Sequence, residues 1–377
     1  MYLDRTYKPR RKRRGVARFW PLIALAVVAI ILYEQQPAWL ASQPMAPTVE
    51  PTRSGAAFLS DAEIAYKSGN VAAAMEAYEQ VIRLEPDNPK PLAALSTLYL
   101  MLQDLPKSAE MAEKAVALAP TDTDALNALA RARDWQGEYE AGLNYALDAL
   151  EIEPKNATTL AILAEIYTDV GNWDRAEDYL QQALEADPQN MLALRNTAFL
   201  YEMRGDYTAA VAAYDQAIAA APYRFDLYIG KARQHRVGLY EYDKAIEAYE
   251  QAVGVYESAV TLDALGDGLY NAGDHLQAVR VLRKAVELDP NYGPALVHLG
   301  MALYARRNYE DAAVELDKGL SLIGDNARIE QIYTAGLAHI YKSPPECDKA
   351  LVWLNKALEI DPQSGPALEG LSLCRTQ

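Results

Sequence analysis

The chain is poor in the residues that most often carry chemistry. Its 377 residues include two cysteines and four histidines, and the scattered histidines supply no metal-ligand cluster. There is no Gly-rich phosphate loop, no HExxH motif and no grouping of Ser, His and Asp of the kind that supports nucleophilic catalysis. Val, Ile and Thr never form the alternating runs of a half-buried strand. The sequence therefore predicts an all-α protein that is not an enzyme and that holds no metal or cofactor.

Positive charge is scarce everywhere except at the N-terminus. Residues 1–20 carry eight Lys and Arg against Asp4, a net charge of +7, so the remainder of a chain with a total of −16 carries −23. An acidic protein of this kind repels nucleic acid and anionic lipid. DNA or RNA binding needs a basic face, and the sequence has none beyond the N-terminus. We therefore expect no nucleic-acid partner.

The basic segment is followed by an apolar stretch of 15 residues, 19–33. A membrane-spanning helix needs ~20 residues, and residues 15–17 would bring the stretch into range. The positive flank predicts that the N-terminus stays in the cytoplasm. We expect a basic cytoplasmic tail over residues 1–18, a single transmembrane helix over 19–33, and a Pro-rich linker over 34–54. The rest of the chain would then be extracytoplasmic.

Two alternatives for this segment stay open. A cleaved signal peptide also has a basic start and a short apolar core. Cleavage after Ala38 or Ala41 would place Gln36 or Trp39 at the −3 position, where a small residue is preferred. The other alternative is a soluble protein with a basic tail.

Prolines are the clearest regular feature of the sequence. Steps of 34 residues join Pro86, Pro120, Pro154, Pro188 and Pro222, and two further steps reach Pro290. A fixed period of this length indicates one helical unit stacked many times. Proline ends the second helix of each unit, because it lacks the amide hydrogen and disfavours the α conformation of the residue before it.

Other columns agree in phase with the prolines. One column of small residues contains Ala130, Ala164, Ala198, Ala232, Gly266 and Gly300. Small side chains at these places let helix axes approach closely. A second column contains Gly69, Gly137, Gly171, Gly205 and Gly273, which we assign to a tight turn between the two helices of a unit.

These columns closely resemble the tetratricopeptide repeat (TPR) family. The resemblance implies a right-handed superhelical solenoid of antiparallel helix pairs. About nine repeats would fill residues 55–363, and a capping helix would follow over 364–377. In the family, the first helices line a concave groove that binds peptides or protein segments.

Three places depart from the pattern. The sixth unit has an extra residue within 238–242, the eighth has Gly324 where a proline is expected, and the ninth has an insertion at 343–345. They represent either drift in a tolerant array or local changes of superhelical pitch.

Helical phasing places a set of polar and aromatic side chains on the concave side. The candidate partner-binding residues are Asn127, Arg131, Trp135, Arg195, Phe199, Arg233, Arg236, Tyr270 and Tyr304. Arg and aromatic residues dominate binding hot spots. We expect Arg195, Arg233 and Arg236 to receive carboxylates of a partner. The alternative is that these arginines are solvated or paired with nearby Asp and Glu.

Cys347 and Cys374 are a candidate disulfide that would staple the C-terminal cap of an exported array, although an antiparallel register does not place them level.

The sequence as a whole predicts a membrane-anchored scaffold for protein–protein interaction, in envelope assembly or secretion. The alternative is an exported soluble protein that binds peptide or carbohydrate after signal cleavage.

Overall fold

The computed structural model describes residues 19–34 and 53–375. The chain divides into two units at the junction of Arg53 and Ser54, and each is described by itself. In the first unit, α1 (Trp20–Glu34) is a helix of 15 residues with no buried side chain. At 1.5 Å per residue it is ~22 Å long, whereas the hydrocarbon core of a bilayer is ~30 Å thick. Among the described residues, no helix has both the length and the apolar character needed to span a membrane.

Where the sequence predicts a transmembrane helix, over 19–33, the structure shows an exposed apolar helix and does not support a membrane span. The predicted basic tail and most of the predicted linker lie outside the described residues.

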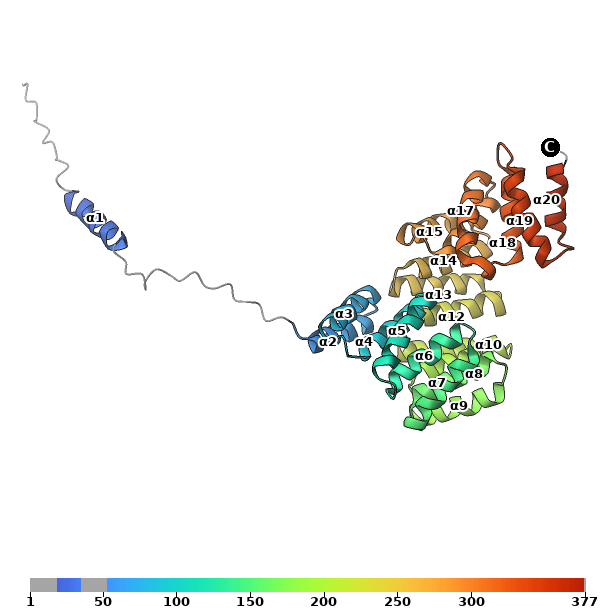
Figure 1. Cartoon of the computed structure of the whole chain (residues 1–377). Coiled ribbons are helices and arrows are strands. Elements are labelled where there is room, and N and C mark those ends of the chain that lie inside the picture. Colours follow the sequence, from blue (N-terminus) through green and yellow to red (C-terminus); the bar gives the residue numbers. More distant parts are fainter. Residues whose placement is uncertain (1–18, 35–52, 376–377) are drawn as a thin grey trace, which may run out of the picture. The chain divides into compact units, whose positions relative to one another are not determined.

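The second unit is all-helical over its described residues and stacks nine helix pairs with a final single helix (Figure 1). The pairs are α2 (Gly55–Lys67) with α3 (Val71–Leu84), α4 (Lys90–Met101) with α5 (Leu105–Leu118), α6 (Thr123–Trp135) with α7 (Tyr139–Ile152), α8 (Ala157–Asp169) with α9 (Trp173–Ala186), α10 (Met191–Met203) with α11 (Tyr207–Ala220), α12 (Phe225–Arg233) with α13 (Tyr242–Val255), α14 (Ala259–Asn271) with α15 (His275–Leu288), α16 (Gly293–Ala305) with α17 (Tyr309–Ile323), and α18 (Ile329–Tyr341) with α19 (Cys347–Ile360). The last helix is α20 (Gly365–Arg375). We call residues 54–375 the array.

The turn inside each pair requires a left-handed backbone conformation. The five glycines of the turn column have φ between +76° and +86°, which glycine adopts without steric cost. Gln103, Tyr240 and Arg307 occupy the equivalent turns of other pairs, with φ of 62°, 57° and 63°. The prediction of a tight turn at this column is confirmed, and the geometry persists where glycine is absent.

The column of small residues brings the two helices of a pair together. A Cβ atom on Gly266 would lie 2.4 Å from Cγ of Leu282, and one on Gly300 would lie 2.5 Å from Cγ of Leu316. The leucines themselves are fully buried. These two pairs thus interlock a glycine of the first helix with a leucine of the second, as close packing demands.

The departures from the period have local structural consequences. The extra residue of the sixth pair is absorbed by a π-helical turn, Gln234–Gly238, directly after α12, as expected for a one-residue insertion in a helix. Gly324 ends α17 with φ of +58° and begins a short 3₁₀ turn, Gly324–Asn326. Residues 343–345 form the connection between α18 and α19.

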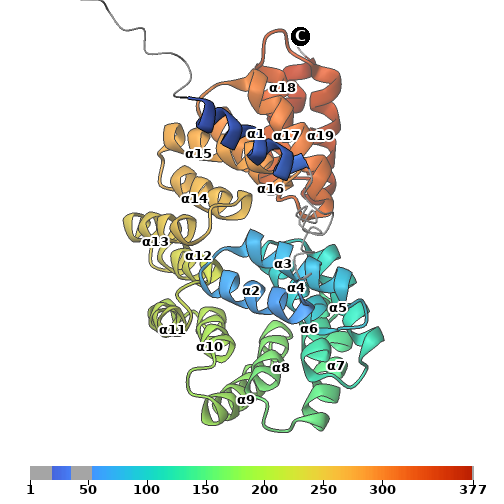
Figure 2. The same cartoon turned by 90° about the vertical axis from the view of Figure 1, so that its left-hand side faces the viewer.

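The array turns back on itself, so that its first pair packs on its sixth (Figure 2). One hydrophobic cluster joins Tyr78 and Leu95 to Phe225, which is fully buried at the start of α12. At its edge, the Tyr66 and Tyr223 rings meet edge to face with centroids 5.2 Å apart. Tyr66 and Tyr223, which are 157 positions apart in the sequence, are thus in direct contact, and the first helices from α2 to α12 form a closed circuit.

At the other end of the array, Cys347 begins α19 and Cys374 lies in the last turn of α20. Their sulfur atoms are bonded at 2.09 Å, with Cα atoms 5.6 Å apart. The register of α19 and α20 therefore does place the two cysteines level, contrary to the objection raised from the sequence. The disulfide ties the final helix to the last pair.

Candidate functional site

The candidate groove residues lie on the first helices of successive pairs or directly after them. α6 carries Asn127, Arg131 and Trp135 at steps of four residues, which places all three on one face. α10 carries Arg195 and Phe199 with the same spacing. The others are Arg233 at the end of α12, Arg236 in the π-helical turn, Tyr270 in α14 and Tyr304 in α16.

Three of these side chains converge on the carboxylate of Glu165, which is not among the residues predicted from the sequence. Glu165 of α8 accepts hydrogen bonds from Nε of Arg131 at 3.0 Å, Nε1 of Trp135 at 2.9 Å and Nη1 of Arg195 at 2.6 Å. The Arg195 guanidinium lies 5.6 Å from the ring centroids of both Trp135 and Phe199. Three consecutive first helices, α6, α8 and α10, are thereby joined through one side chain.

The charge balance at Glu165 is set by burial and by its neighbours. Its side chain is only 1% exposed, and burial alone would raise its pKa. The guanidinium groups of Arg131 and Arg195 outweigh that effect and hold the pKa of Glu165 at about 2. The carboxylate is therefore ionised at neutral pH, as a buried charge with good partners can be.

Two further carboxyl groups lie close to this cluster. Burial, and then the negative charges of Glu165 and Asp169, raise the pKa of Asp134. Burial and the charge of Glu165 likewise raise the pKa of Asp169. Asp134 is 3% exposed and sits among like charges, an arrangement that favours a proton on the pair.

Ion pairs continue along the concave side beyond α10. Glu202 of α10 pairs with Arg233 at 2.8 Å and accepts a hydrogen bond from Gln234 at 2.7 Å. Arg236 lies 3.3 Å from Asp267 of α14. Each of these pairs joins one unit to the next.

The ion pairs between successive first helices form a ladder that begins at Arg131 and Glu165 and ends at His298 of α16. Its Nδ1 atom lies 2.7 Å from Oδ1 of Asp263 of α14, and its Nε2 atom lies 4.0 Å from Asp267. Burial would lower the pKa of His298, but the two carboxylates raise it to about 9. The imidazole is therefore charged at neutral pH.

The three arginines proposed to receive a partner's carboxylates are thus paired with acidic residues of this chain. Arg195 pairs with Glu165, Arg233 with Glu202 and Arg236 with Asp267. This is the alternative that the sequence left open. Asn127 does not reach Glu165, and its amide nitrogen donates to Oγ1 of Thr159 at 2.9 Å.

The two tyrosines belong to separate aromatic contacts nearer the C-terminus. The Tyr270 ring lies 5.2 Å from that of His275, and the Tyr304 ring lies 5.4 Å from that of Tyr309 and 6.5 Å from that of Tyr341. Both are half-buried, so neither belongs to the group around Glu165.

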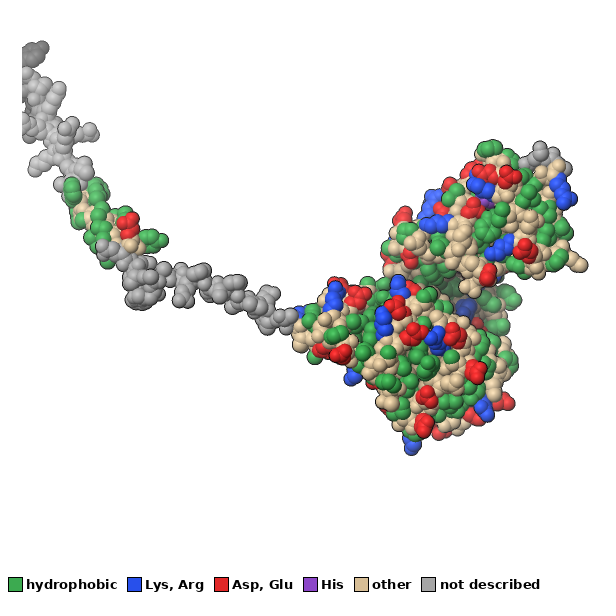
Figure 3. Space-filling model, viewed as in Figure 1, with side chains coloured by type: hydrophobic (Ala, Val, Ile, Leu, Met, Phe, Trp, Pro, Cys, Tyr) green, Lys and Arg blue, Asp and Glu red, His purple; other side chains and the backbone are tan. Residues whose placement is uncertain are grey.

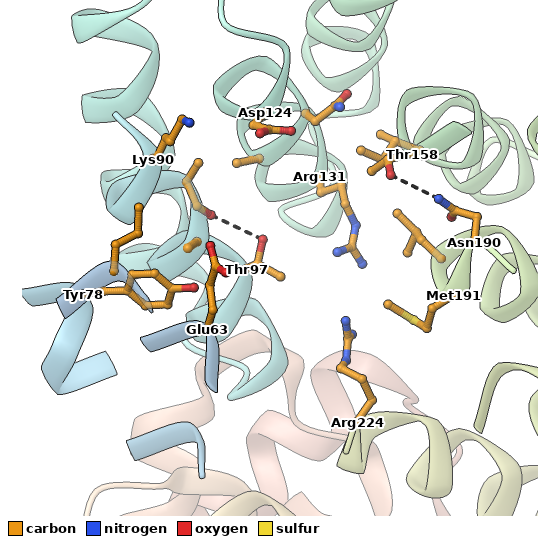
Figure 4. Close-up of a pocket in the computed structure, with 17 residues that line it drawn as sticks. Glu63, Tyr78, Lys90, Thr97, Asp124, Arg131, Thr158, Asn190, Met191 and Arg224 are labelled. Atoms are coloured by element: carbon orange, nitrogen blue, oxygen red, sulfur yellow. Dashed lines mark hydrogen bonds between the residues drawn. The ribbon is translucent and has the colours of Figure 1, made fainter. Parts of the chain in front are cut away.

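A cavity of about 550 Å³ lies within the closed circuit (Figure 4). First helices from α2 to α10 line it, together with α3 and Arg224 directly before α12. The guanidinium groups of Arg131 and Arg224 point toward one another from opposite walls. Arg224 is held by a bidentate pair with Asp226, at 2.7 and 2.6 Å, and donates to the hydroxyl of Tyr66 at 3.2 Å. The cavity exists because the first helix pair, α2 and α3, closes over the concave side.

The sequence does contain a signal for the group around Glu165. Arg131, Glu165 and Phe199 lie one period apart in the same column, and opposite charges one period apart on neighbouring first helices can pair. The cavity has no comparable signal, because it depends on contacts between residues that are far apart in the sequence.

Acidic and basic side chains are interspersed on the face of the array seen in Figure 3. Among the residues that the structure describes, no three His, Cys, Asp or Glu side chains are grouped so that they could hold a metal ion. The organised polar features are therefore the ladder of ion pairs and the cavity.

Family models of the tetratricopeptide repeat match three stretches of this chain, residues 65–132, 163–225 and 269–335. The array is built of tetratricopeptide repeats. TPR proteins bind peptides or other proteins, which is the general role that this architecture supports. A search of curated proteins finds no match.

One solved structure supports the fold. A chain of the APC/C hetero-tetramer Cut9-Hcn1 superposes with a TM-score of 0.63 and 19% identity, covering 85% of this chain and 63% of its own length. A TPR protein from Parabacteroides merdae is 20% identical, covering 66% of this chain and 98% of its own, with a TM-score of 0.43. YrrB, described as a TPR protein with an unusual peptide-binding site, is 26% identical over 51% of this chain and 97% of its own, with a TM-score of 0.40.

Proposed function

We propose that this TPR array is a scaffold that binds segments of partner proteins on its concave side and performs no catalysis. The observation that carries the proposal is the cavity, which opens among the first helices of consecutive repeats and is lined by both apolar and charged side chains. The ladder of ion pairs supports it, because it fixes the spacing between successive first helices. A preformed surface of this kind loses little conformational entropy when a partner binds.

Site-specific photo-crosslinking in cells tests this proposal. A benzoylphenylalanine placed at Thr158, which lines the cavity, is expected to capture partner proteins. The same group at the exposed Asp148 of α7 serves as the control. The scaffold proposal fails if Thr158 captures nothing or captures the same proteins as Asp148.

We further propose that α1 attaches the array to a membrane, with the N-terminus in the cytoplasm and the array on the far side, where it would serve envelope assembly or secretion. The support is the apolar surface of α1, on which Trp20, Leu25 and Leu32 are each more than 60% exposed. Apolar surface of this extent needs a covering, and the adjacent basic segment favours the cytoplasmic side.

Membrane fractionation with a carbonate wash tests the attachment. The full chain is expected in the pellet, and a chain that lacks residues 1–34 in the supernatant. The intact mass decides the alternative of an exported soluble protein, because an uncleaved chain weighs 41.6 kDa whereas signal cleavage near residue 40 would remove the whole anchor.

A further inference from the structure

The cavity presents a polar surface whose arginines are already engaged. Arg131 pairs with Glu165, and Arg224 pairs with Asp226 through two hydrogen bonds. The guanidinium groups that face each other across the cavity are each neutralised by a carboxylate of this chain. Their positive charge is therefore offset within the chain, which weakens the attraction of these arginines for an anionic ligand.

Hydrogen-bond acceptors, by contrast, are left over in the same cavity. Asn127 is 4% exposed, and its Oδ1 atom is buried without a hydrogen-bond partner. A buried polar atom in that state is unfavourable and calls for a donor. Two lining carboxylates, Asp124 and Glu63, also make no ion pair among the described residues.

The local charge and the overall charge both favour a cation. Asp124 and Glu63 are opposed by Lys90, the lining cation that lacks a carboxylate within 4.0 Å in the described array. Figure 4 shows Asp124 and Glu63 on neighbouring walls. The chain beyond residue 20 carries −23, so its field attracts basic segments and repels acidic ones.

The dimensions restrict what can enter. The cavity of about 550 Å³ falls in the range of pockets that hold small ligands, ~300–1,000 Å³. One long side chain of an extended segment does fit.

We propose that the cavity binds a Lys or Arg side chain of an extended partner segment. The aliphatic stem packs against Leu59, Ile162 and Met191 of the lining, as such stems commonly do. The charged end donates hydrogen bonds to Oδ1 of Asn127 and to the Asp124 and Glu63 carboxylates. This inference rests on the proposed scaffold function and specifies the chemistry that the scaffold recognises.

The test measures binding of rhodamine-labelled seven-residue peptides to the full-length protein by fluorescence anisotropy, at up to millimolar protein. The central residue is arginine, lysine, citrulline or glutamate in a Gly, Ser and Ala background. Arginine and lysine are expected to bind about tenfold more tightly than citrulline, because citrulline keeps the shape of arginine and loses the charge-assisted hydrogen bonds. Absence of binding, or equal binding of arginine and citrulline, overturns the proposal.

Variants locate the site. Asp124→Asn and Glu63→Gln are each expected to weaken the arginine peptide several-fold, and Lys90→Ala to strengthen it, because Lys90 competes for the same carboxylates. All three residues are exposed, so folding should be retained and is checked by thermal melting. Asp148→Asn removes the same charge from α7 outside the cavity.

The proposal is overturned if Asp148→Asn weakens binding as much as Asp124→Asn, since the effect would then come from overall charge. It is also overturned as a peptide site if N-acetylarginine amide binds as tightly as the peptide. Capture of partners at Thr158 without any preference for basic peptides would refute this inference and leave the scaffold function standing. Absence of both the capture at Thr158 and the preference for basic peptides would refute the scaffold function as well.

Discussion

In the closed circuit from α2 to α12 a carboxylate lies between two cations, whereas in the C-terminal part of the array a histidine lies between two carboxylates. Glu165 lies between Arg131 and Arg195, and His298 lies between Asp263 and Asp267. Both clusters use charge to join first helices of adjacent repeats. The charges of this concave surface therefore balance one another along its length, so that a partner meets the groups left unpaired and not the arginines.

The two regions also differ in how their ends are secured. The circuit from α2 to α12 is closed by contacts of Tyr66 in α2 with Tyr223 and Arg224, which directly precede α12. The last repeat is covered by α20 and held by the Cys347–Cys374 disulfide. Terminal repeats of a solenoid need such protection, because each repeat is otherwise stabilised by its neighbours alone.

The largest expected effect comes from Glu165→Gln. The change leaves Arg131 and Arg195 buried without a counter-charge, which costs about 3–5 kcal/mol. Urea denaturation of the full chain measures the free energy of unfolding. Glu177→Gln, which breaks the exposed pair with Arg204, is the matched control and should cost less than about 1 kcal/mol. Similar losses for the two variants would contradict the role assigned to Glu165.

Loss of the disulfide is the counterpart at the other end. Cys374→Ser opens a bridge between residues 27 apart in the sequence, which predicts a loss of about 3.5 kcal/mol from chain entropy. Because α20 packs on α18 and α19, hydrogen exchange should increase there and stay unchanged at α6–α10. Uniformly faster exchange throughout the array would show that the two ends are not independent.

The two charged clusters are expected to respond to pH in opposite directions. The pKa of His298 is raised to about 9, so its contribution is complete below the unfolded value of about 6.5 and is lost as pH rises toward 9, by up to about 3 kcal/mol. The pKa of Glu165 is lowered to about 2, so its contribution is complete above about 4.5 and is lost as pH falls.

Unfolding of His298→Gln, followed between pH 6 and 9, checks the first half of this prediction. The variant should lose the alkaline decline. A decline of equal size in the wild type and the variant would assign it to other groups.

Closure of the circuit from α2 to α12 is tested by Tyr66→Phe, for which we expect a smaller effect. The variant removes the hydroxyl that accepts a hydrogen bond from Arg224 at 3.2 Å, and bonds to charged groups contribute about 1.5–3 kcal/mol. Faster hydrogen exchange is expected at α2 and at the start of α12, with no change at α16–α19. Unchanged exchange at α2 would mean that packing around Phe225 alone closes the circuit.

The smallest effects concern the turns. Gly137→Ala keeps free space, since nothing lies within 4 Å of the added Cβ atom, and should cost ~1 kcal/mol because φ is +80°. Arg307→Gly at the equivalent turn of the eighth pair relieves the same strain and should stabilise the array. Thermal melting distinguishes the two signs, and destabilisation by Arg307→Gly would indicate that its side chain matters more than its backbone.

The sequence by itself determined the local units of this protein. The proline and glycine columns specify where helices end and turn, because those effects act within a few residues. Arg131 and Glu165 stand in the same column one repeat apart, so the sequence also contains both members of an ion pair between neighbouring repeats. The exposed α1 is apolar as the sequence requires, and its attachment to a membrane remains a prediction.

Only the tertiary structure decided that the array closes. The contact of Tyr66 with Tyr223 depends on small rotations between repeats, which accumulate over five successive interfaces. No residue encodes that sum, since each rotation is set by the packing of a whole interface. The cavity, the orphaned Oδ1 atom of Asn127 and the level placement of Cys347 and Cys374 all follow from such packing. The 34-residue period describes the repeat, and the packing of one repeat on the next decides where residues 158 positions apart meet.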